Sequence, residues 1–189
     1  MNSFYSSEEL KDIGFRNIGE QVLISRNCCI YGASRISIGH NVRIDDFCVL
    51  SGNIIIGNYV HIAVGCAVFG GTSGIEFKDY TALSSRSAIY AESDDYTGEA
   101  MTNPTIPDEF RKVTGGKVVL EKYALVGTGC TILPNVTIGE GASVGAMSLI
   151  NKSLSSWGMY AGIPCRKIRD RSRNIMNLEQ KFVDTVARL

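Results

Sequence analysis

Residues 126–154 read VGTGCTILPNVTIGEGASVGAMSLINKSL. An aliphatic residue returns every six positions in this stretch, a period that is neither helical nor the simple alternation of a half-buried strand. The same period covers most of the chain, with a two-residue slip after Ile36, a restart at Phe77 and one long interruption. The repeated positions are Ile18, Ile24, Ile30 and Ile36, then Ile38, Ile44, Leu50, Ile56, Ile62 and Val68, then Phe77, Leu83 and Ile89, and finally Leu120, Val126, Ile132, Ile138, Val144 and Ile150.

A second series lies four positions after the first and favours small residues. We interpret each six-residue unit as one short strand and one corner of a triangular coil, with both series pointing inward. Three units complete a coil, and stacked coils pair their strands in parallel. The fold class is therefore an all-β solenoid. The second series holds Val22, Cys28, Ser34, Cys48, Val60, Cys66, Ser87, Cys130, Val136, Ala142 and Ser148.

The repeat also explains most of the cysteines. Four of the six occupy the small inward position, which favours buried packing over redox or nucleophilic chemistry. Cys29 and Cys165 lie outside that register and stay unassigned. No Cys/His spacing suits a metal, so we expect none. A β-sandwich, the alternative fold, would alternate with period two and space its strands about 8–12 residues apart.

Length and charge limit the possible functions. The chain of 189 residues suits one main fold. Its 19 basic and 19 acidic residues cancel and form no long block of one sign, which disfavours nucleic acid or an anionic membrane as a partner. The N-terminus lacks a charged-then-apolar signal pattern, and no stretch approaches about 18 apolar residues. We predict a cytoplasmic protein without membrane insertion.

Three segments depart from the repeat. In residues 1–17, Ser6 and Glu9 predict a capping box and a short helix that covers the first coil. Residues 18–164 form the solenoid, interrupted at 90–119 by a polar insertion typical of an exposed binding loop. Residues 165–189 predict a C-terminal helix that packs against the coils or a neighbouring subunit. Its apolar stripe holds Ile175, Leu178, Phe182 and Val186.

From about residue 18 to 169 the chain resembles the bacterial hexapeptide-repeat acetyltransferases, which include maltose and galactoside acetyltransferases and surface-polysaccharide acyltransferases. The most specific matches are residues 126–154 and YAGIPCRKIR at 160–169. The resemblance implies a left-handed parallel β-helix, acetyl-CoA as co-substrate, and a homotrimer with sites between subunits. It places pantetheine near Gly127, Ala146 and Ser148. It places the rest of the cofactor near Pro164 and the basic residues Lys152, Arg166 and Lys167, which suit phosphate.

One departure from the family concerns the acceptor. The sugar O-acetyltransferases have a histidine base in a segment like IYTATHP, whereas this chain reads IYAESDD with Asp94 in that place. An ordinary aspartate, with a pKa of about 3.9, is a poor base for a hydroxyl. His61, in VHIAVGC on the corner side of a repeat, resembles the histidine of sugar N-acetyltransferases. His40 lies in a turn, where solvent exposure is the expected fate.

These features favour N-acetylation of a nucleotide-linked amino sugar in surface-polysaccharide synthesis. Asp94 would orient the amine or accept its proton, and His61 would assist. O-acetylation with His61 as base stays open, as does a non-catalytic scaffold. A hydratase like the γ-carbonic anhydrases needs three histidines, and the chain has two. We expect the acceptor to contact Ser84, Arg86, Tyr90, Tyr96 and Asn103.

Overall fold

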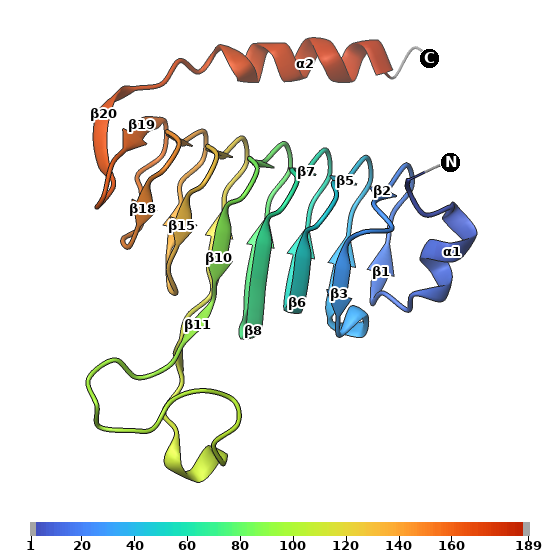
Figure 1. The fold of residues 1–189 in the computed structure, drawn as a ribbon. Coiled ribbons are helices and arrows are strands. Elements are labelled where there is room, and N and C mark those ends of the chain that lie inside the picture. Colours follow the sequence, from blue (N-terminus) through green and yellow to red (C-terminus); the bar gives the residue numbers. More distant parts are fainter. Residues whose placement is uncertain (1–2, 187–189) are drawn as a thin grey trace.

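The computed structural model describes residues 3–186 as a left-handed parallel β-helix with a helix at each end (Figure 1). The predicted fold is confirmed. One face is a sheet whose strands pair in parallel, closed by the antiparallel β20. In spatial order this sheet comprises β2 (Leu23–Ile24), β5 (Arg43–Ile44), β7 (His61–Ile62), β9 (Ala82–Leu83), β14 (Leu125–Val126), β17 (Ser143–Val144), β19 (Gly158–Ala161) and β20 (Arg166–Asp170).

The remaining coil strands form a second sheet, because β6 and β8 continue past a corner and join two faces through a register shift. All its strand pairs are parallel, as stacked coils require. Its members are β1 (Asn17–Ile18), β3 (Cys29–Tyr31), β4 (Ile36–Ile38), β6 (Val49–Ile56), β8 (Ala67–Phe77), β10 (Ala88–Tyr90), β13 (Val118–Leu120), β15 (Thr131–Ile132), β16 (Thr137–Ile138) and β18 (Leu149–Ile150).

The aliphatic series stacks into the core. Ile44, Ile62, Leu83 and Val126 are direct neighbours in successive parallel strands, and each has zero exposed area. Burying one such side chain contributes about 1.5–3 kcal/mol. Because every coil contacts the next through this column, the core extends along the whole axis of the solenoid.

The inward cysteines pack as the repeat predicted. Cys48 and Cys66 are fully buried, and their thiols point at the carbonyl oxygens of Ala63 and Ser84, at 3.1 and 3.2 Å. Burial raises the pKa of the Cys28 thiol to about 12, which keeps it protonated. Packing, as opposed to thiolate chemistry, is therefore the role of this series. Of the two cysteines outside it, Cys29 is exposed and Cys165 half-buried.

One corner of the solenoid holds aromatic residues where the repeat predicted Gly or Asn. Tyr59, Tyr80, Tyr123 and Trp157 have φ between 56° and 63°, in the left-handed region. Such a backbone is unfavourable for a bulky residue. The rings compensate by stacking along the axis, with centroids 5.0 Å apart for Tyr59–Tyr80 and 5.8 Å for Tyr80–Tyr123.

Both ends of the solenoid carry helices. The Ser6–Glu9 capping box is present, and helix α1 (Ser7–Asp12) buries Leu10 against the first coils. The C-terminal segment differs from the prediction, because its first part pairs with β19 as strand β20 and helix begins only in α2 (Asn174–Val186). The expected end segments also included residues 1–2 and 187–189, which lie outside the described residues.

Helix α2 runs along the coils over the aromatic corner (Figure 1). Phe182 meets the Tyr59 ring edge-on at 5.2 Å, and Ile175 and Leu178 line the same groove. Glu179 accepts from the Tyr123 hydroxyl and pairs with Lys122. The prediction that the apolar stripe packs against the coil is confirmed. No helix within residues 3–186 has the length and apolar character needed to cross a membrane.

The insertion leaves the solenoid after β10 and returns at β13. A two-stranded antiparallel stem, β11 (Glu92–Ser93) and β12 (Thr114–Gly115), carries it away from the coils (Figure 1). The described residues include two short 3-10 helices, η1 (Ala33–Arg35) and, within the loop, η2 (Asp108–Phe110). Tyr96 is 93% exposed at the outer part of the loop. The expectation of an exposed loop is confirmed.

Candidate functional site

Small side chains follow the strands of the first sheet. These small residues lie one above another, because the backbone N–H of each donates to a carbonyl near the end of the next strand of the sheet. They are Ala63, Ser84, Gly127 and Gly145. A Cβ on Gly127 would lie 2.6 Å from the Ala146 nitrogen, so this position requires glycine. Ser84 therefore lies beside a shallow strip that continues towards the C-terminal coils.

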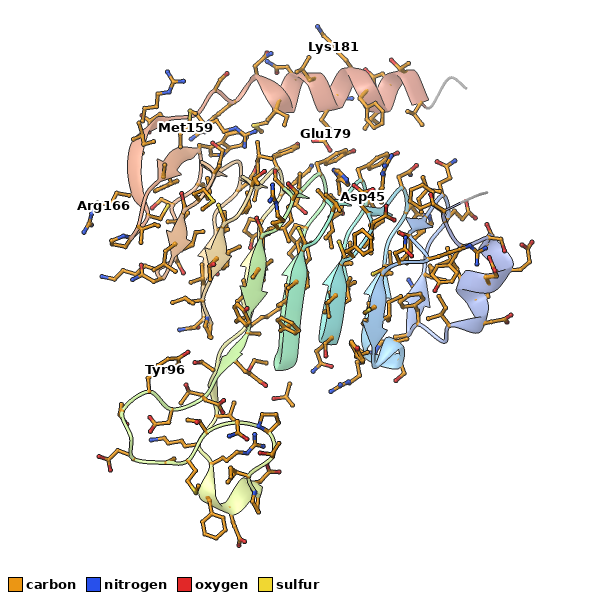
Figure 2. The ribbon with its side chains drawn as sticks, viewed as in Figure 1. Asp45, Tyr96, Met159, Arg166, Glu179 and Lys181 are labelled. Atoms are coloured by element: carbon orange, nitrogen blue, oxygen red, sulfur yellow. The ribbon has the colours of Figure 1, made fainter. Side chains whose placement is uncertain are left out.

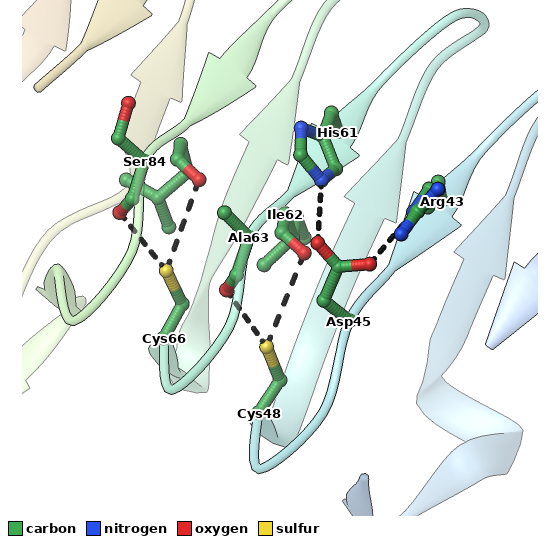
Figure 3. Close-up of polar contacts among 9 residues, drawn as sticks. Arg43, Asp45, Cys48, His61, Ile62, Ala63, Cys66 and Ser84 are labelled. Carbon is green, nitrogen blue, oxygen red and sulfur yellow. Dashed lines mark hydrogen bonds and ion pairs between the residues drawn. The ribbon is translucent and has the colours of Figure 1, made fainter. Parts of the chain in front are cut away.

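His61 lies in strand β7, between β5 and β9 of this sheet. It points outward from strand β7, so the expected position at a corner is corrected. Its Nε2 lies 2.8 Å from Asp45 Oδ2, while Arg43 Nε donates to Asp45 Oδ1 at 2.7 Å (Figure 3). Burial raises the pKa of Asp45, but the bonds from Arg43 and His61 outweigh it and leave that pKa lowered. Asp45 is thus an anionic partner for an accessible imidazole.

His40, the other histidine, has a structural role in a turn. Its ring Nδ1 accepts from the backbone N–H of Glu20 at 3.1 Å. The backbone N–H of His40 donates to Asn58 Oδ1 at 2.8 Å. The imidazole therefore bridges two corners of successive coils.

Asp94 directly follows strand β11 in the inserted loop. One carboxylate oxygen accepts from the Asn103 N–H at 3.3 Å, and its carbonyl accepts from the Ser93 hydroxyl. Figure 1 shows the loop below the coils, whereas β7 belongs to the first sheet and lies near the upper edge of the coils. A single chain therefore does not bring Asp94 and His61 together.

The loop around Asp94 is organised by its own side chains. Asp95 accepts from the Thr97 hydroxyl and from three backbone N–H groups, and these bonds lower its pKa to about 2. Asn103, predicted to bind substrate, uses its side-chain oxygen to accept from the Thr105 N–H and hydroxyl. That amide is committed to a turn, which leaves Tyr96 as the freely exposed candidate in this part of the loop.

Arg111 was absent from the sequence prediction. Its guanidinium donates to the Asn103 carbonyl at 3.3 Å and to Asp108. Its Nε is buried and has no partner among the described residues. One basic residue in a polar loop gives no sequence signal for such a role, because its partners are set by the loop fold.

Ser84, Arg86 and Tyr90 occupy three different places around the coil. Ser84 follows β9, Arg86 is exposed at the next corner with φ 57°, and Tyr90 ends β10 near the loop. The Tyr90 ring stacks on Phe69 with centroids 5.4 Å apart. Tyr90 is thus closest to the loop stem, and Ser84 faces the strip near Gly127.

The predicted cofactor residues gather towards the C-terminal coils. The Ser148 hydroxyl is buried, donates to the Gly145 carbonyl and accepts from the Gly162 N–H, so it holds a corner. Ala146, beside it, is exposed, and its N–H has no hydrogen-bond partner among the described residues. A backbone donor is therefore available where the resemblance places pantetheine.

The basic residues lie on and near the hairpin that closes the solenoid. Arg166 projects from β20 into solvent (Figure 2), and Lys152 is exposed. Lys167 pairs with Asp170 at 2.6 Å, and this bond raises the pKa of Lys167. Pro164 lies between β19 and β20, in the turn of the hairpin. Among residues 3–186, no group of three His, Cys, Asp or Glu side chains is placed to hold a metal ion.

A β-helix of six-residue units, with one long polar loop and a basic closing hairpin, defines the class of hexapeptide-repeat transferases. The family model described as "Bacterial transferase hexapeptide (six repeats)" matches residues 117–152. The chain is 40% identical over 177 residues to dTDP-4-amino-4,6-dideoxy-D-glucose acyltransferase of Escherichia coli, covering 92% of each protein. It belongs to the hexapeptide-repeat sugar acyltransferases and is an acyltransferase.

Solved structures agree with this assignment. AntD, an N-acyltransferase from Bacillus cereus, is 51% identical to the chain. A variant of AntD in complex with dTDP-4-amino-4,6-dideoxyglucose and coenzyme A superimposes with a TM-score of 0.95, covering 98% of this chain and 99% of that one. AntD with dTDP and 3-hydroxybutyryl-CoA gives a TM-score of 0.96, covering 99% of this chain and 100% of that one.

Proposed function

We propose that this protein transfers an acetyl group from acetyl-CoA to the amino group of a dTDP-linked 4-amino-4,6-dideoxy sugar, as a step in surface-polysaccharide synthesis. The observation that carries the proposal is the similarity over nearly the whole chain to an N-acyltransferase that binds this class of amino sugar together with coenzyme A. The aspartate at position 94, in place of the histidine of the sugar O-acetyltransferases, agrees with an amine acceptor.

The chemistry of an amine explains why no strong base is needed. A sugar amine resembles an α-amino group, with a pKa of about 7.7–8.0, so about half of it is neutral near that pH and has a lone pair free to attack the thioester carbonyl carbon. A backbone N–H stabilises the oxyanion of the tetrahedral intermediate. Asp94 orients the amine and accepts the proton that nitrogen loses, while the C–S bond breaks and coenzyme A leaves.

The cofactor lies along the strip of small residues towards the closing hairpin. The free N–H of Ala146 donates to the pantetheine arm, and Lys152, Arg166 and Lys167 contact the phosphates. The ion pair of Lys167 with Asp170 is exposed to solvent and therefore weak. A phosphate can therefore replace Asp170 as the partner of Lys167 at small cost.

The acceptor site is composite and forms between subunits of a homotrimer. Asp94 lies in the inserted loop, which Figure 1 shows extending away from the coils, whereas Ser84 follows β9 in the first sheet. We therefore assign the two residues of one site to different subunits. The outward residues of the second sheet support this arrangement, because a row of apolar side chains faces solvent there. Two register positions make up this row. The first holds Val49, Ala67, Ala88 and Leu149 and is interrupted by Thr131, and the second holds Phe69 and Tyr90 beside Ser51.

O-acetylation of a sugar hydroxyl is the second candidate, and the Asp45–His61 pair favours it. The Asp45 carboxylate accepts from Nε2–H of the neutral ring, so Nδ1 keeps its lone pair. A lone pair at Nδ1 can accept a proton from a substrate hydroxyl, as a general base does. The side chain of His61 is 47% exposed, so an acceptor can reach it. In this reading His61, and not Asp94, removes the proton.

One assay separates the two functions. The purified chain is incubated with acetyl-CoA and, in parallel, dTDP-4-amino-4,6-dideoxyglucose, UDP-linked amino sugars and plain glycosides, while thiol release is followed. We expect turnover with the dTDP amino sugar and a product amide resistant to mild alkali. Turnover of glycosides alone, giving an alkali-labile ester, would establish O-acetylation. If the chain uses 3-hydroxybutyryl-CoA in preference to acetyl-CoA, then the transferred group is 3-hydroxybutyryl and not acetyl.

A further inference from the structure

The base of the inserted loop is fixed by one carboxylate. Glu92 opens strand β11, and its Oε1 accepts from the Thr72 N–H at 2.7 Å and the Thr72 hydroxyl at 2.6 Å. The same oxygen accepts from the Ser73 N–H at 3.0 Å and the Ser73 hydroxyl at 3.2 Å. Four donors on one oxygen are more than a surface glutamate needs, so the 72–73 turn of β8 is shaped to receive this group.

Glycines make room for this carboxylate. A Cβ on Gly71, whose φ is +51°, would lie 2.1 Å from Glu92 Oε2. A Cβ on Gly115, which pairs with Glu92 across the stem, would lie 2.3 Å from the Ser73 hydroxyl oxygen. Any side chain at either position would displace the Glu92 carboxylate from the 72–73 turn or separate the two strands of the stem.

The turn that holds Glu92 is itself tied to the preceding coil. Asn53 Nδ2 donates to the Thr72 carbonyl at 2.9 Å. The backbone of Gly70 approaches Asn53 so closely that a Cβ there would lie 2.2 Å from the Asn53 carbonyl oxygen. A chain of contacts thus runs from β6 through the β8 turn to the loop stem. The rigid solenoid determines where the stem points.

We propose that Glu92 is a positioning residue for acyl transfer, which holds the loop stem so that Asp94, two residues further on, meets the acceptor amine. The inference rests on the proposed function of Asp94. Among residues 3–186, the carboxylate of Asp94 is hydrogen-bonded only within the loop, to the Asn103 N–H, and not to the solenoid. Its placement therefore depends on the stem, where Glu92 makes the side-chain bonds to β8.

The test uses Glu92→Ala and Glu92→Gln, with Glu99→Ala as the matched control. Glu99 lies in the same loop, and its exposed side chain makes no contact among the described residues. We expect Glu92→Ala to lower kcat about 10- to 100-fold, because a small misplacement of a reacting group has effects of that order. The KM for acetyl-CoA should stay within about twofold. The glutamine, whose amide oxygen still accepts, should recover most of the rate.

Two further measurements separate positioning from general damage. In an Asp94→Asn background, Glu92→Ala should reduce kcat by less than about threefold more, because the two residues act through one group. Trypsin should cut after Arg111 or Lys112 faster in Glu92→Ala than in wild type or Glu99→Ala, while the melting temperature stays unchanged.

The inference would be overturned if the loss of kcat in the double variant equalled the product of the losses in the two single variants. It would also be overturned if Glu92→Ala kept the kcat and the cleavage rate of the wild type. The protease result needs no substrate. If the wild-type chain acylates no amino sugar, the proposed function fails, and Glu92 then loses its role in the reaction even where the cleavage rate shows that it holds the loop.

Discussion

His61 Nε2 lies 2.8 Å from Asp45 Oδ2, and Asp45 is also bound by Arg43. Because a carboxylate only accepts, Nε2 of the neutral ring carries the hydrogen and Nδ1 keeps the lone pair. Asp45 directly follows β5 and His61 begins the adjacent strand β7, so the two residues meet only because the coils stack in one register. The pair gives this face a histidine of fixed orientation beside Ser84.

The lowered pKa of Asp45 makes stability depend on pH. Its ordinary value is 3.8, and the folded value is lower, so the unfolded chain binds the proton more readily. The stabilisation is complete above about pH 3.8 and disappears as pH falls through the folded pKa. We expect urea denaturation to show wild type more stable than Asp45→Asn at pH 6, with the difference shrinking below pH about 3.8. A constant difference down to pH 3 would contradict this.

Asp94→Asn and His61→Gln distinguish the two candidate reactions. If Asp94 accepts the amine proton, Asp94→Asn should lower turnover about 10²–10⁴-fold, while His61→Gln costs less. With an alcohol acceptor the order reverses, and activity should rise with pH through about 6.5. Both variants are assayed across pH. Full activity in Asp94→Asn together with loss in His61→Gln would refute the amine mechanism.

Replacing Arg166 and Lys167 with Ala should raise the KM for acetyl-CoA more than it lowers kcat. Phosphate contacts are largely equal in the ground state and the transition state, so their loss acts on binding. A dephospho analogue of acetyl-CoA, which lacks one of the phosphates, should show a smaller difference between variant and wild type. An unchanged affinity for acetyl-CoA in the double variant would mean that the two residues are only surface charge.

The homotrimer is tested by light scattering on the purified chain, with Phe69→Asp as the disrupting variant. Phe69 stacks on Tyr90 within the outward apolar row, and a buried unpaired carboxylate there is costly. We expect a trimer for wild type and monomers, without activity, for the variant. A wild-type monomer at working concentration would rule out the composite site.

Helix α2 should detach when its contacts with the aromatic corner are removed. Phe182→Ala removes two edge-on ring contacts, to Tyr59 and Tyr80, worth about 0.5–1.5 kcal/mol each. Hydrogen exchange of α2 amides should accelerate while that of the coil amides does not. Val183→Ala, a neighbouring exposed residue that does not line the groove, is the control. Equal exchange in both variants would show that the helix is held elsewhere.

For much of the site, the sequence could predict which residues take part but not which contacts their side chains make. The interruption of the repeat located the loop, whereas Asp94 and the basic residues near the closing hairpin were assigned through the resemblance to the family. The sequence did not predict that Asn103 is used in a turn, or that Glu92 is seated in the turn of β8. Both depend on how the loop folds back, and no local pattern encodes that.

The sequence by itself determined the solenoid, the inward cysteines and the first capping box. Each of these depends on residues at a fixed short spacing along the chain, so it can be recognised from the sequence directly. The tertiary structure decided the rest. Strand β20 replaces the start of the expected helix because β19 offers an unpaired edge, the aromatic corner exists because rings in successive coils stack, and Asp45 meets His61 across 16 residues. Such contacts depend on how slips and insertions shift one coil against the next, which only the folded chain specifies.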